Sequence, residues 1–317
     1  MKIVLIILLF ISPIFSYDYL QNRDVQKFIN YMEKEHKFNK SELESIFKKT
    51  KFDKKVLSKY TVPKKAYRSD ASWKIYENNL VVPLMFKRAK RFKNTHLKLL
   101  KKISKKYKVD INIIIAVAGV ESNFARNTGN FSIINSLTTL AFFKNRKQKF
   151  FKYELEEYLL LCREKGYDIF KLKGSFAGAM GVVQQLPSIN REYGVDYDRD
   201  GISNPWSIPD ALASIANFLH LNGWNNSRDI VISSRYNKKE PLLLESGFDK
   251  YYSINTLKDN GLIFANFKQE NATLIELNGN IGRELWLGDK NFDILTSYNN
   301  SINYAMALYR ISKMIDK

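Results

Sequence analysis

The pattern of apolar and polar positions predicts helices over the first third of the chain. From residue 24 to about 110, apolar residues recur at the three- and four-residue spacing of amphipathic helices, and glycine is rare. Ser41 and Glu44 have the spacing of a capping box, which predicts a helix start at Ser41, and a long amphipathic run ends near Lys108. We therefore expect a helical N-terminal lobe over residues 17–108.

The middle of the chain combines an apolar helix with a long polar loop. Asp110 is placed to cap INIIIAVAGVES, which is apolar on nearly every side and predicts a buried helix. A further helix is predicted at 146–165. Gly, Ser, Pro, Asp and Asn dominate residues 173–209, a composition typical of functional loops. A helix in DALASIANFLHLNGW ends at Gly223, so we expect a central core over 109–229.

The last third predicts a small sheet and a closing helix. Between residues 230 and 296 apolar and polar residues alternate and aromatic residues are frequent, which is typical of antiparallel strands. The final segment, 297–317, contains a helix from about residue 301. With 317 residues, 45% of them hydrophobic, the chain is long enough for a substantial core. The predicted fold class is therefore mainly α with a small β segment (α+β).

The N-terminus has the features of an export signal. Lys2 precedes an apolar run that is short for a membrane span but typical of a signal peptide at residues 1–16, although a retained anchor is an alternative. No cysteine stands directly after the run, so a lipoprotein is not expected, and we predict a periplasmic location. The single cysteine, Cys162, excludes an intramolecular disulfide and is expected to be buried in a helix.

The chain is strongly basic. Lys and Arg number 51 against 32 Asp and Glu, a formal charge of +19 that favours a polyanion or an acidic surface as partner. The predicted export favours cell-wall polymers and anionic lipids over nucleic acid. Much of the excess lies in KRAKRFKNTHLKLLKKISKKYK, which also has the ordinary interpretation of a solvated helix face.

Glu121 is the first candidate for chemistry. It stands at the end of the apolar helix, where its carboxyl group can enter a poorly hydrated place. Desolvation disfavours the anion and raises the pKa, and a carboxyl group that stays protonated near neutral pH can act as the general acid of a glycosidase. The spacing alone also fits a helix-terminal glutamate that faces solvent.

The segment DYDRDGIS predicts a calcium loop. Its D-x-D-x-D-G pattern places three carboxylates at alternate positions, which repel one another unless a cation lies among them. The twelfth position is Ser207 instead of the usual glutamate, which excludes a standard EF-hand and leaves a later aspartate to close a lengthened loop. A structural Ca²⁺ site is expected at Asp196, Asp198, Asp200, the carbonyl of Ile202, and Asp210. The alternative is that these aspartates only form Asx turns in a loop without a cation.

Other catalytic motifs are missing. No HExxH, CxxC cluster or phosphate-binding glycine loop occurs, and His36, His96 and His220 fall in three separate helical segments. Ser175 in GSFAG differs from a nucleophile elbow because the serine stands second and no strand is predicted before it. Metal catalysis and a serine nucleophile are therefore not expected.

The order of four motifs resembles one enzyme family. GVES, KGSFAGAMGVVQQLPS, VDYDRDGISNPWSIPDALASIANFLHLNGW and YNNSINYAMAL, spread over about residues 70–310, resemble the lytic transglycosylase B family of murein-degrading enzymes. The resemblance implies a lysozyme-like helical core, a helical N-terminal lobe and one calcium site. It also implies cleavage of the β-1,4 bond between N-acetylmuramic acid and N-acetylglucosamine without water.

The resemblance also assigns roles to residues. It implies that Glu121 is the catalytic acid and base, and that the loop D-x-D-x-D-G with its late aspartate holds calcium. The saccharide contacts that it implies are Ser175, Gln184, Tyr298, Tyr304, Tyr76 and Arg146. The sequence departs from the family at Val183, Gln185 and Lys147, of which Val183 puts the glycan contacts beside Gln184 in doubt more than the chemistry.

Two rival functions stay open at this stage. A hydrolytic muramidase would need the same acid on the same scaffold, and a non-catalytic protein could keep the cleft to bind the cell wall. The expected partners are peptidoglycan glycan strands, with other cell-wall enzymes as candidate companions. Nucleic acid is not expected as a partner, and the protein is expected to be a monomer.

Overall fold

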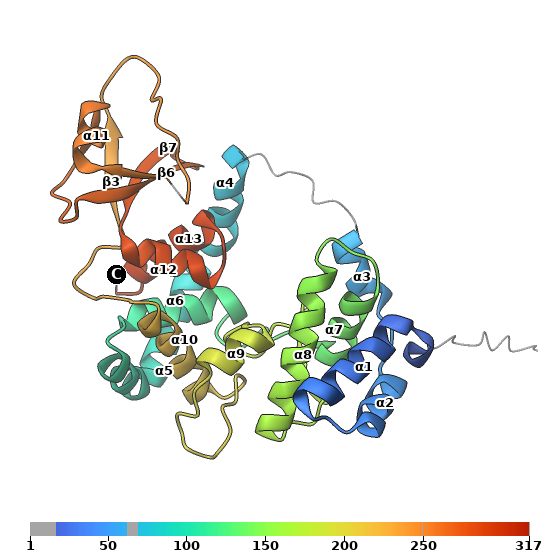
Figure 1. The fold of residues 1–317 in the computed structure, drawn as a ribbon. Coiled ribbons are helices and arrows are strands. Elements are labelled where there is room, and N and C mark those ends of the chain that lie inside the picture. The colour runs from blue at the N-terminus through green and yellow to red at the C-terminus, as the bar shows by residue number, and fades with distance from the viewer. Residues whose placement is uncertain (1–16, 62–68, 249, 317) are drawn as a thin grey trace, which may run out of the picture. The chain divides into compact units, whose positions relative to one another are not determined.

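The computed structural model describes residues 17–61, 69–248 and 250–316, and it is mainly helical with a small sheet (Figure 1). This confirms the predicted fold class. The predicted signal peptide at residues 1–16 lies outside the described residues. The chain forms two compact units: unit 1 comprises Met1–Val62 and Ile134–Glu156, and unit 2 comprises Pro63–Ile133 and Glu157–Lys317.

This division differs from the predicted lobe at residues 17–108. Unit 1 ends at Val62 and is completed by a segment that lies more than seventy residues later in the chain. The helices between residues 69 and 107 belong to unit 2, where they pack on its central helices and its sheet. Hydrophobic periodicity predicts that a helix has a buried face, but it does not specify which other helix covers that face.

Unit 1 is a small helical bundle with an aromatic core. Phe28, Phe47 and Phe142 contact one another edge to face, with ring centroids 5.7 to 6.1 Å apart. Its elements are a 3₁₀ turn at Tyr19–Gln21, α1 (Arg23–His36), α2 (Lys40–Lys49), α3 (Lys54–Thr61), most of α7 (Ile133–Phe142), and the first half of α8 (Gln148–Lys165), which continues into unit 2.

The start of α2 corrects one prediction. The helix begins at Lys40, and its N-cap is Asn39, whose side chain accepts a hydrogen bond from the backbone N–H of Glu42 at 3.1 Å. Ser41 donates its hydroxyl to the same Asn39 side chain at 2.6 Å. Asparagine is as good an N-cap as serine, and here it stands two residues earlier, so the predicted capping box is wrong.

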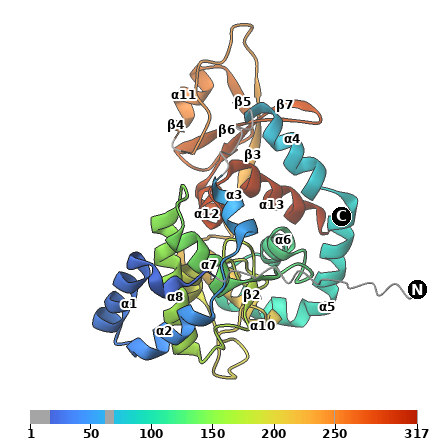
Figure 2. The same cartoon turned by 90° about the vertical axis from the view of Figure 1, so that its right-hand side faces the viewer.

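Unit 2 surrounds the apolar helix α6 (Ile111–Ser122). Asp110 caps it as predicted, accepting from the backbone N–H groups of Asn112 and Ile113. Helices that precede and follow it in the chain pack on α6 (Figure 2). The helices of unit 2 are α4 (Ser69–Leu80), α5 (Pro83–Tyr107), α6, the second half of α8, α9 (Pro187–Tyr193), α10 (Ile208–Leu221), α11 (Ile254–Asp259), α12 (Lys290–Tyr298) and α13 (Ile302–Met314).

Unit 2 also contains the predicted sheet. Its five antiparallel strands lie in the order β4-β6-β7-β3-β5, and a short two-stranded pair, β1-β2, lies elsewhere in the unit. In β6, Leu274 faces a local core with α11, whereas Ile275 and Leu277 face the main helical core, where α4 packs. The strands are β1 (Phe131–Ser132), β2 (Lys173–Gly174), β3 (Val231–Tyr236), β4 (Tyr251–Ser253), β5 (Leu262–Phe264), β6 (Asn271–Gly279) and β7 (Gly282–Gly288).

Two further findings concern membrane-spanning helices and the cysteine. Across the described residues, no helix combines the length and the apolar character needed to cross a membrane. Cys162 is buried in α8 as expected, and burial raises the pKa of its thiol to about 12. A thiol with so high a pKa is almost entirely protonated at neutral pH and is therefore a poor nucleophile.

Candidate active site

Glu121 lies in the last turn of α6, where the backbone turns sharply. Asn123, Phe124 and Ala125 follow with φ angles of 51°, 59° and 65°, three consecutive left-handed residues without a glycine. Ser122 supports the turn, since its hydroxyl donates to the carbonyl of Ala118 and accepts from the N–H of Ala125. Left-handed residues of this kind are strained and concentrate at functional sites, and here they end the helix directly after Glu121.

The carboxyl group of Glu121 is only partly accessible to solvent. Burial raises the pKa of Glu121 from 4.5 to about 7, and a hydrogen bond from Tyr304 partly offsets that rise. The hydroxyl of Tyr304 donates to Oε1 of Glu121 at 2.6 Å. A carboxyl group with this pKa is present in both protonation states near neutral pH, as a group that first donates and then accepts a proton requires.

Two tyrosines connect Glu121 to the loop that carries Gln184. Tyr304 is fully buried, and its ring stacks on that of Tyr298, with centroids 6.4 Å apart and an angle of 11° between the planes. The hydroxyl of Tyr298 donates to the carbonyl of Val183 at 2.8 Å. α6, α12, α13 and the loop at residues 183–185 thus meet through one chain of contacts.

A pocket of about 360 Å³ opens beside the carboxyl group. Tyr76 and Tyr304, both implied by the family resemblance, line it together with Glu121. Among the described residues that line it, Glu121 has the sole carboxylate. Its other lining residues were not predicted from the sequence; they are Ile75, Asn79, Leu80, Val120 and Asn299.

Three of these residues were within reach of sequence reasoning. Asn79 and Leu80 follow Tyr76 at the three- and four-residue spacing that places side chains on one side of α4. Asn299 stands next to Tyr298 in the motif YNNS. The side chains beside a motif residue on the same helix face were therefore the signal to follow.

Ser175 and Gln184 each organise a tight turn. The Ser175 hydroxyl accepts hydrogen bonds from the backbone N–H groups of Ala177 and Ala179, at 3.2 and 3.0 Å. Gln184 has a positive φ of 48°, and its amide nitrogen donates to the carbonyls of Thr128 and Gly181, at 3.1 and 2.8 Å. Ser175, Gln184 and Tyr298 are not among the described residues that line the pocket beside Glu121, so their roles toward a saccharide stay predictions.

Arg146, the last predicted glycan contact, is likewise not among the described residues that line the pocket. Arg146 belongs to unit 1, where its guanidinium group lies over the ring of Tyr60, 4.9 Å from the centroid. Its role toward a saccharide stays a prediction. At the departures from the family pattern, the side chains of Val183 and Gln185 are buried, at 0% and 4% exposure, and Val183 belongs to the main core.

The predicted calcium loop brings three carboxylates together. Asp196, Asp198 and Asp210 each place an oxygen within 4.8 Å of the other two. Asp210 is buried at the first turn of α10, and burial raises the pKa of its carboxyl group. Asp200 instead accepts from the N–H of Ile202 at 2.9 Å, and both are exposed. Three converging carboxylates are the oxygen ligands that Ca²⁺ prefers, so the residues present fit this ion.

The chain is similar to known murein-degrading enzymes. A family model described as the transglycosylase SLT domain matches residues 20–313. The membrane-bound lytic murein transglycosylase B of Escherichia coli (strain K12) is 32% identical over 308 residues, which cover 94% of this chain and 84% of that protein.

Solved structures show the same fold. The E. coli lytic transglycosylase Slt35 in complex with calcium superimposes with a TM-score of 0.87 at 31% identity, over 95% of each chain. SltB3 of Pseudomonas aeruginosa in complex with NAG-anhNAM-pentapeptide gives a TM-score of 0.77 at 25% identity, over 92% of this chain and 79% of that one. The resemblance found in the sequence is confirmed: the chain belongs to the transglycosylase SLT-domain family of lytic murein transglycosylases, enzymes that cleave peptidoglycan.

Proposed function

We propose that this enzyme cleaves the β-1,4 bond between N-acetylmuramic acid and N-acetylglucosamine and leaves 1,6-anhydromuramic ends, with Glu121 as its single acid and base. The observation that carries the proposal is a carboxyl group with a pKa of about 7, held by Tyr304 beside a pocket in which no other described lining residue has a carboxylate. A glycosidase that activates water normally uses two carboxyl groups, one on each side of the bond.

The proposed reaction has two proton transfers at one group. Protonated Glu121 donates to the glycosidic oxygen as the bond to C1 breaks, and the N-acetyl group of the muramic acid stabilises the positive charge at C1. The Glu121 carboxylate then takes the proton of the muramic 6-hydroxyl, whose oxygen attacks C1 and closes the anhydro ring. The proton returns to Glu121, so that the group is ready for another cycle and no water is consumed.

Tyr304 and the burial of Glu121 together prepare both steps. The hydrogen bond from Tyr304 favours the carboxylate that must form after the first transfer, while burial favours the acid that must be present before it. The opposing effects hold the pKa near the middle of the physiological range. The SltB3 complex with NAG-anhNAM-pentapeptide supports a saccharide of this class as the ligand of the fold.

We further propose that Asp196, Asp198 and Asp210 hold one calcium ion, with Asp200 and the carbonyl of Ile202 completing the site. The convergence of three carboxylates and the calcium complex of Slt35 support this assignment. A bound cation would offset the repulsion of the three carboxylates and fix the loop between α9 and α10. The ion would therefore stabilise the fold and take no part in the proton transfers.

The proposed site of action is the periplasm, with peptidoglycan glycan strands as substrate and the monomer as the working form. The export signal predicted at the N-terminus and the murein substrate of the family support this location. Other cell-wall enzymes are proposed as companions on the same strands.

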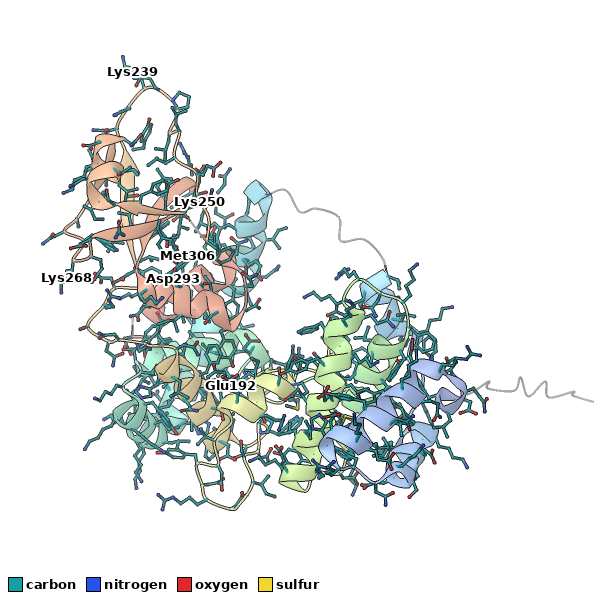
Figure 3. All side chains as sticks on the ribbon, viewed as in Figure 1. Glu192, Lys239, Lys250, Lys268, Asp293 and Met306 are labelled. Atoms are coloured by element: carbon teal, nitrogen blue, oxygen red, sulfur yellow. The ribbon has the colours of Figure 1, made fainter. Side chains whose placement is uncertain are left out.

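The test of the proposal is Glu121→Gln on purified insoluble peptidoglycan. Proton transfer contributes on the order of 10² to 10⁴ in rate, so the variant should release soluble fragments at least about 100-fold more slowly. Glu192→Gln is the matched control, because Glu192 is an exposed carboxylate on α9 (Figure 3). Wild-type rates for Glu121→Gln would show that the acid lies elsewhere.

A further inference from the structure

Helix α5 concentrates the positive charge of the chain. Between Pro83 and Lys108 the sequence has eleven Lys and Arg residues, and it has no acidic residue between Glu77 and Asp110. More than half of the formal charge of +19 therefore comes from one helix and its C-cap. The proposed reaction uses none of these side chains.

The second half of α5 separates charge from core. The helix is kinked at His96, and after the kink Leu100, Ile103 and Tyr107 are buried. The opposite side has four exposed lysines at positions i, i+3, i+4 and i+7, which place them on one face of a helix. We call this set, Lys98, Lys101, Lys102 and Lys105, the lysine face. Figure 3 shows side chains extending outward from α5.

The lysine face differs from other basic residues of the helix in its contacts. Arg88 donates to Asn123 at 2.9 Å, Lys93 bonds Asp316 at 2.5 Å, and Lys106 lies over the rings of Tyr107 and Tyr197. Within the described part of the chain, no lysine of the lysine face forms a salt bridge. Four neighbouring ammonium groups without a carboxylate repel one another and are relieved by an external anion.

An exposed apolar residue lies near the same end of α5. Leu221, the last residue of α10, is 62% exposed. Its neighbour His220 contacts the ring of Tyr107, with centroids 6.3 Å apart, and lines a hollow of about 700 Å³ together with Lys108 and Trp224. The C-terminal ends of α5 and α10 therefore meet, with Lys108 beside this hollow and Leu221 exposed at the end of α10.

We propose that the lysine face and Leu221 dock the enzyme on a membrane surface that contains anionic phospholipids. A row of lysines matches a sheet of phosphate headgroups by charge density alone, without requiring a shaped pocket. An exposed leucine at the same end of the helix gains free energy only where an apolar medium lies behind the charges, which a lipid surface provides and a hydrophilic polyanion does not. Adsorption would hold the enzyme beside the membrane while its active site meets the glycan strands.

The expected strength follows from the number of lysines. Each lysine near an anionic membrane strengthens adsorption by about fivefold at physiological ionic strength. Four lysines together would give several hundredfold, and mutual screening reduces this to on the order of 100-fold. The experiment measures the partition of the full-length protein onto vesicles of phosphatidylcholine, with and without about 30% phosphatidylglycerol, by co-sedimentation.

The test variant replaces all four lysines of the lysine face by glutamine, which keeps helix propensity. The control replaces four exposed lysines of α2 and α3 by glutamine, so that both variants lose the same charge. These residues are Lys40, Lys48, Lys54 and Lys55. The proposal predicts a roughly 100-fold loss of partition onto phosphatidylglycerol vesicles for the first variant and less than threefold for the control. Equal losses in both variants would mean that bulk charge acts, and would overturn the proposal.

Leu221→Ser separates a membrane from a soluble polyanion. The substitution should weaken partition onto phosphatidylglycerol vesicles about threefold to tenfold and leave retention on immobilised dextran sulfate unchanged. A wild-type protein that does not bind the vesicles would contradict the proposal. A lysine-face variant that keeps vesicle binding but loses retention on insoluble peptidoglycan would also contradict it, and would assign the surface to the wall polymer. Fragment release at low protein concentration should be unchanged in the lysine-face variant, which reports that the fold is intact.

Discussion

Removing the hydroxyl that holds Glu121 should shift the pH profile of the enzyme upward. In Tyr304→Phe the hydrogen bond of 2.6 Å to Oε1 is lost, while the ring and its stacking on Tyr298 stay. That bond favours the carboxylate, and burial raises the pKa of Glu121 to about 7 in spite of it. Without the bond the pKa rises further.

The size of the shift follows from the energy of the bond. A hydrogen bond to a charged group contributes about 1.5 to 3 kcal/mol, part of which persists when the acceptor is protonated. A differential contribution of about 1.4 kcal/mol corresponds to one pKa unit. Because the first step needs protonated Glu121, kcat/KM should fall to half at about pH 7 in the wild type and at about pH 8 in Tyr304→Phe.

The assay is the initial rate of fragment release from insoluble peptidoglycan between pH 5 and 9 at constant ionic strength. Tyr298→Phe is the matched control, because its hydroxyl donates to the carbonyl of Val183 and not to Glu121. Its midpoint should stay within about 0.3 unit of the wild type, a small fraction of the expected shift. A midpoint that is unmoved, or lower, in Tyr304→Phe would refute the role assigned to this hydrogen bond.

Three further predictions concern stability. Glu121 is protonated more readily in the folded chain than in the unfolded chain, so the free energy of unfolding of the wild type falls as the pH rises from 4.5 through 7. Glu121→Gln lacks this loss, so its stability relative to the wild type should increase by up to about 3 kcal/mol over that pH range and stay constant above it, as measured by urea unfolding at each pH. Calcium at ten times its dissociation constant should stabilise the protein by about 1.4 kcal/mol, and Asp196→Asn should abolish the increase in melting temperature. Gly181→Ala should destabilise the fold by more than about 2 kcal/mol, because φ is +62° and the added Cβ would lie 2.1 Å from the carbonyl oxygen of Pro205. Gly166→Ala is the control: φ is +66° but the space around the added Cβ is open, so it should lose only about 1 kcal/mol, and equal losses would contradict the clash.

Local patterns in the sequence predicted local structure well. The apolar run at 111–122 and its cap Asp110 define α6, and alternation predicted the strands between residues 230 and 296. The start of α2 shows the limit, since Asn39 and Ser41 are both competent caps and the backbone selects one. Choosing between them requires the packing of the helix, which the local sequence does not contain.

Contacts between residues far apart in the sequence could not be predicted from local sequence patterns. Glu121 and Tyr304 are 183 residues apart, and only the family resemblance brought both into one site. Periodicity likewise did not reveal that the segment 134–156 completes unit 1, because any apolar face can cover another of similar size. The motif containing Arg146 was short, and its packing against Tyr60 in unit 1 could not be read from neighbouring residues.

The most direct test of the central claim is to digest peptidoglycan in water enriched in heavy oxygen and to weigh the products. If Glu121 works alone and the muramic 6-hydroxyl attacks C1, the products are lighter by one water than hydrolysis products and contain no heavy oxygen. Reducing ends that incorporate heavy oxygen would show that water attacks C1, and would make the enzyme a hydrolytic muramidase.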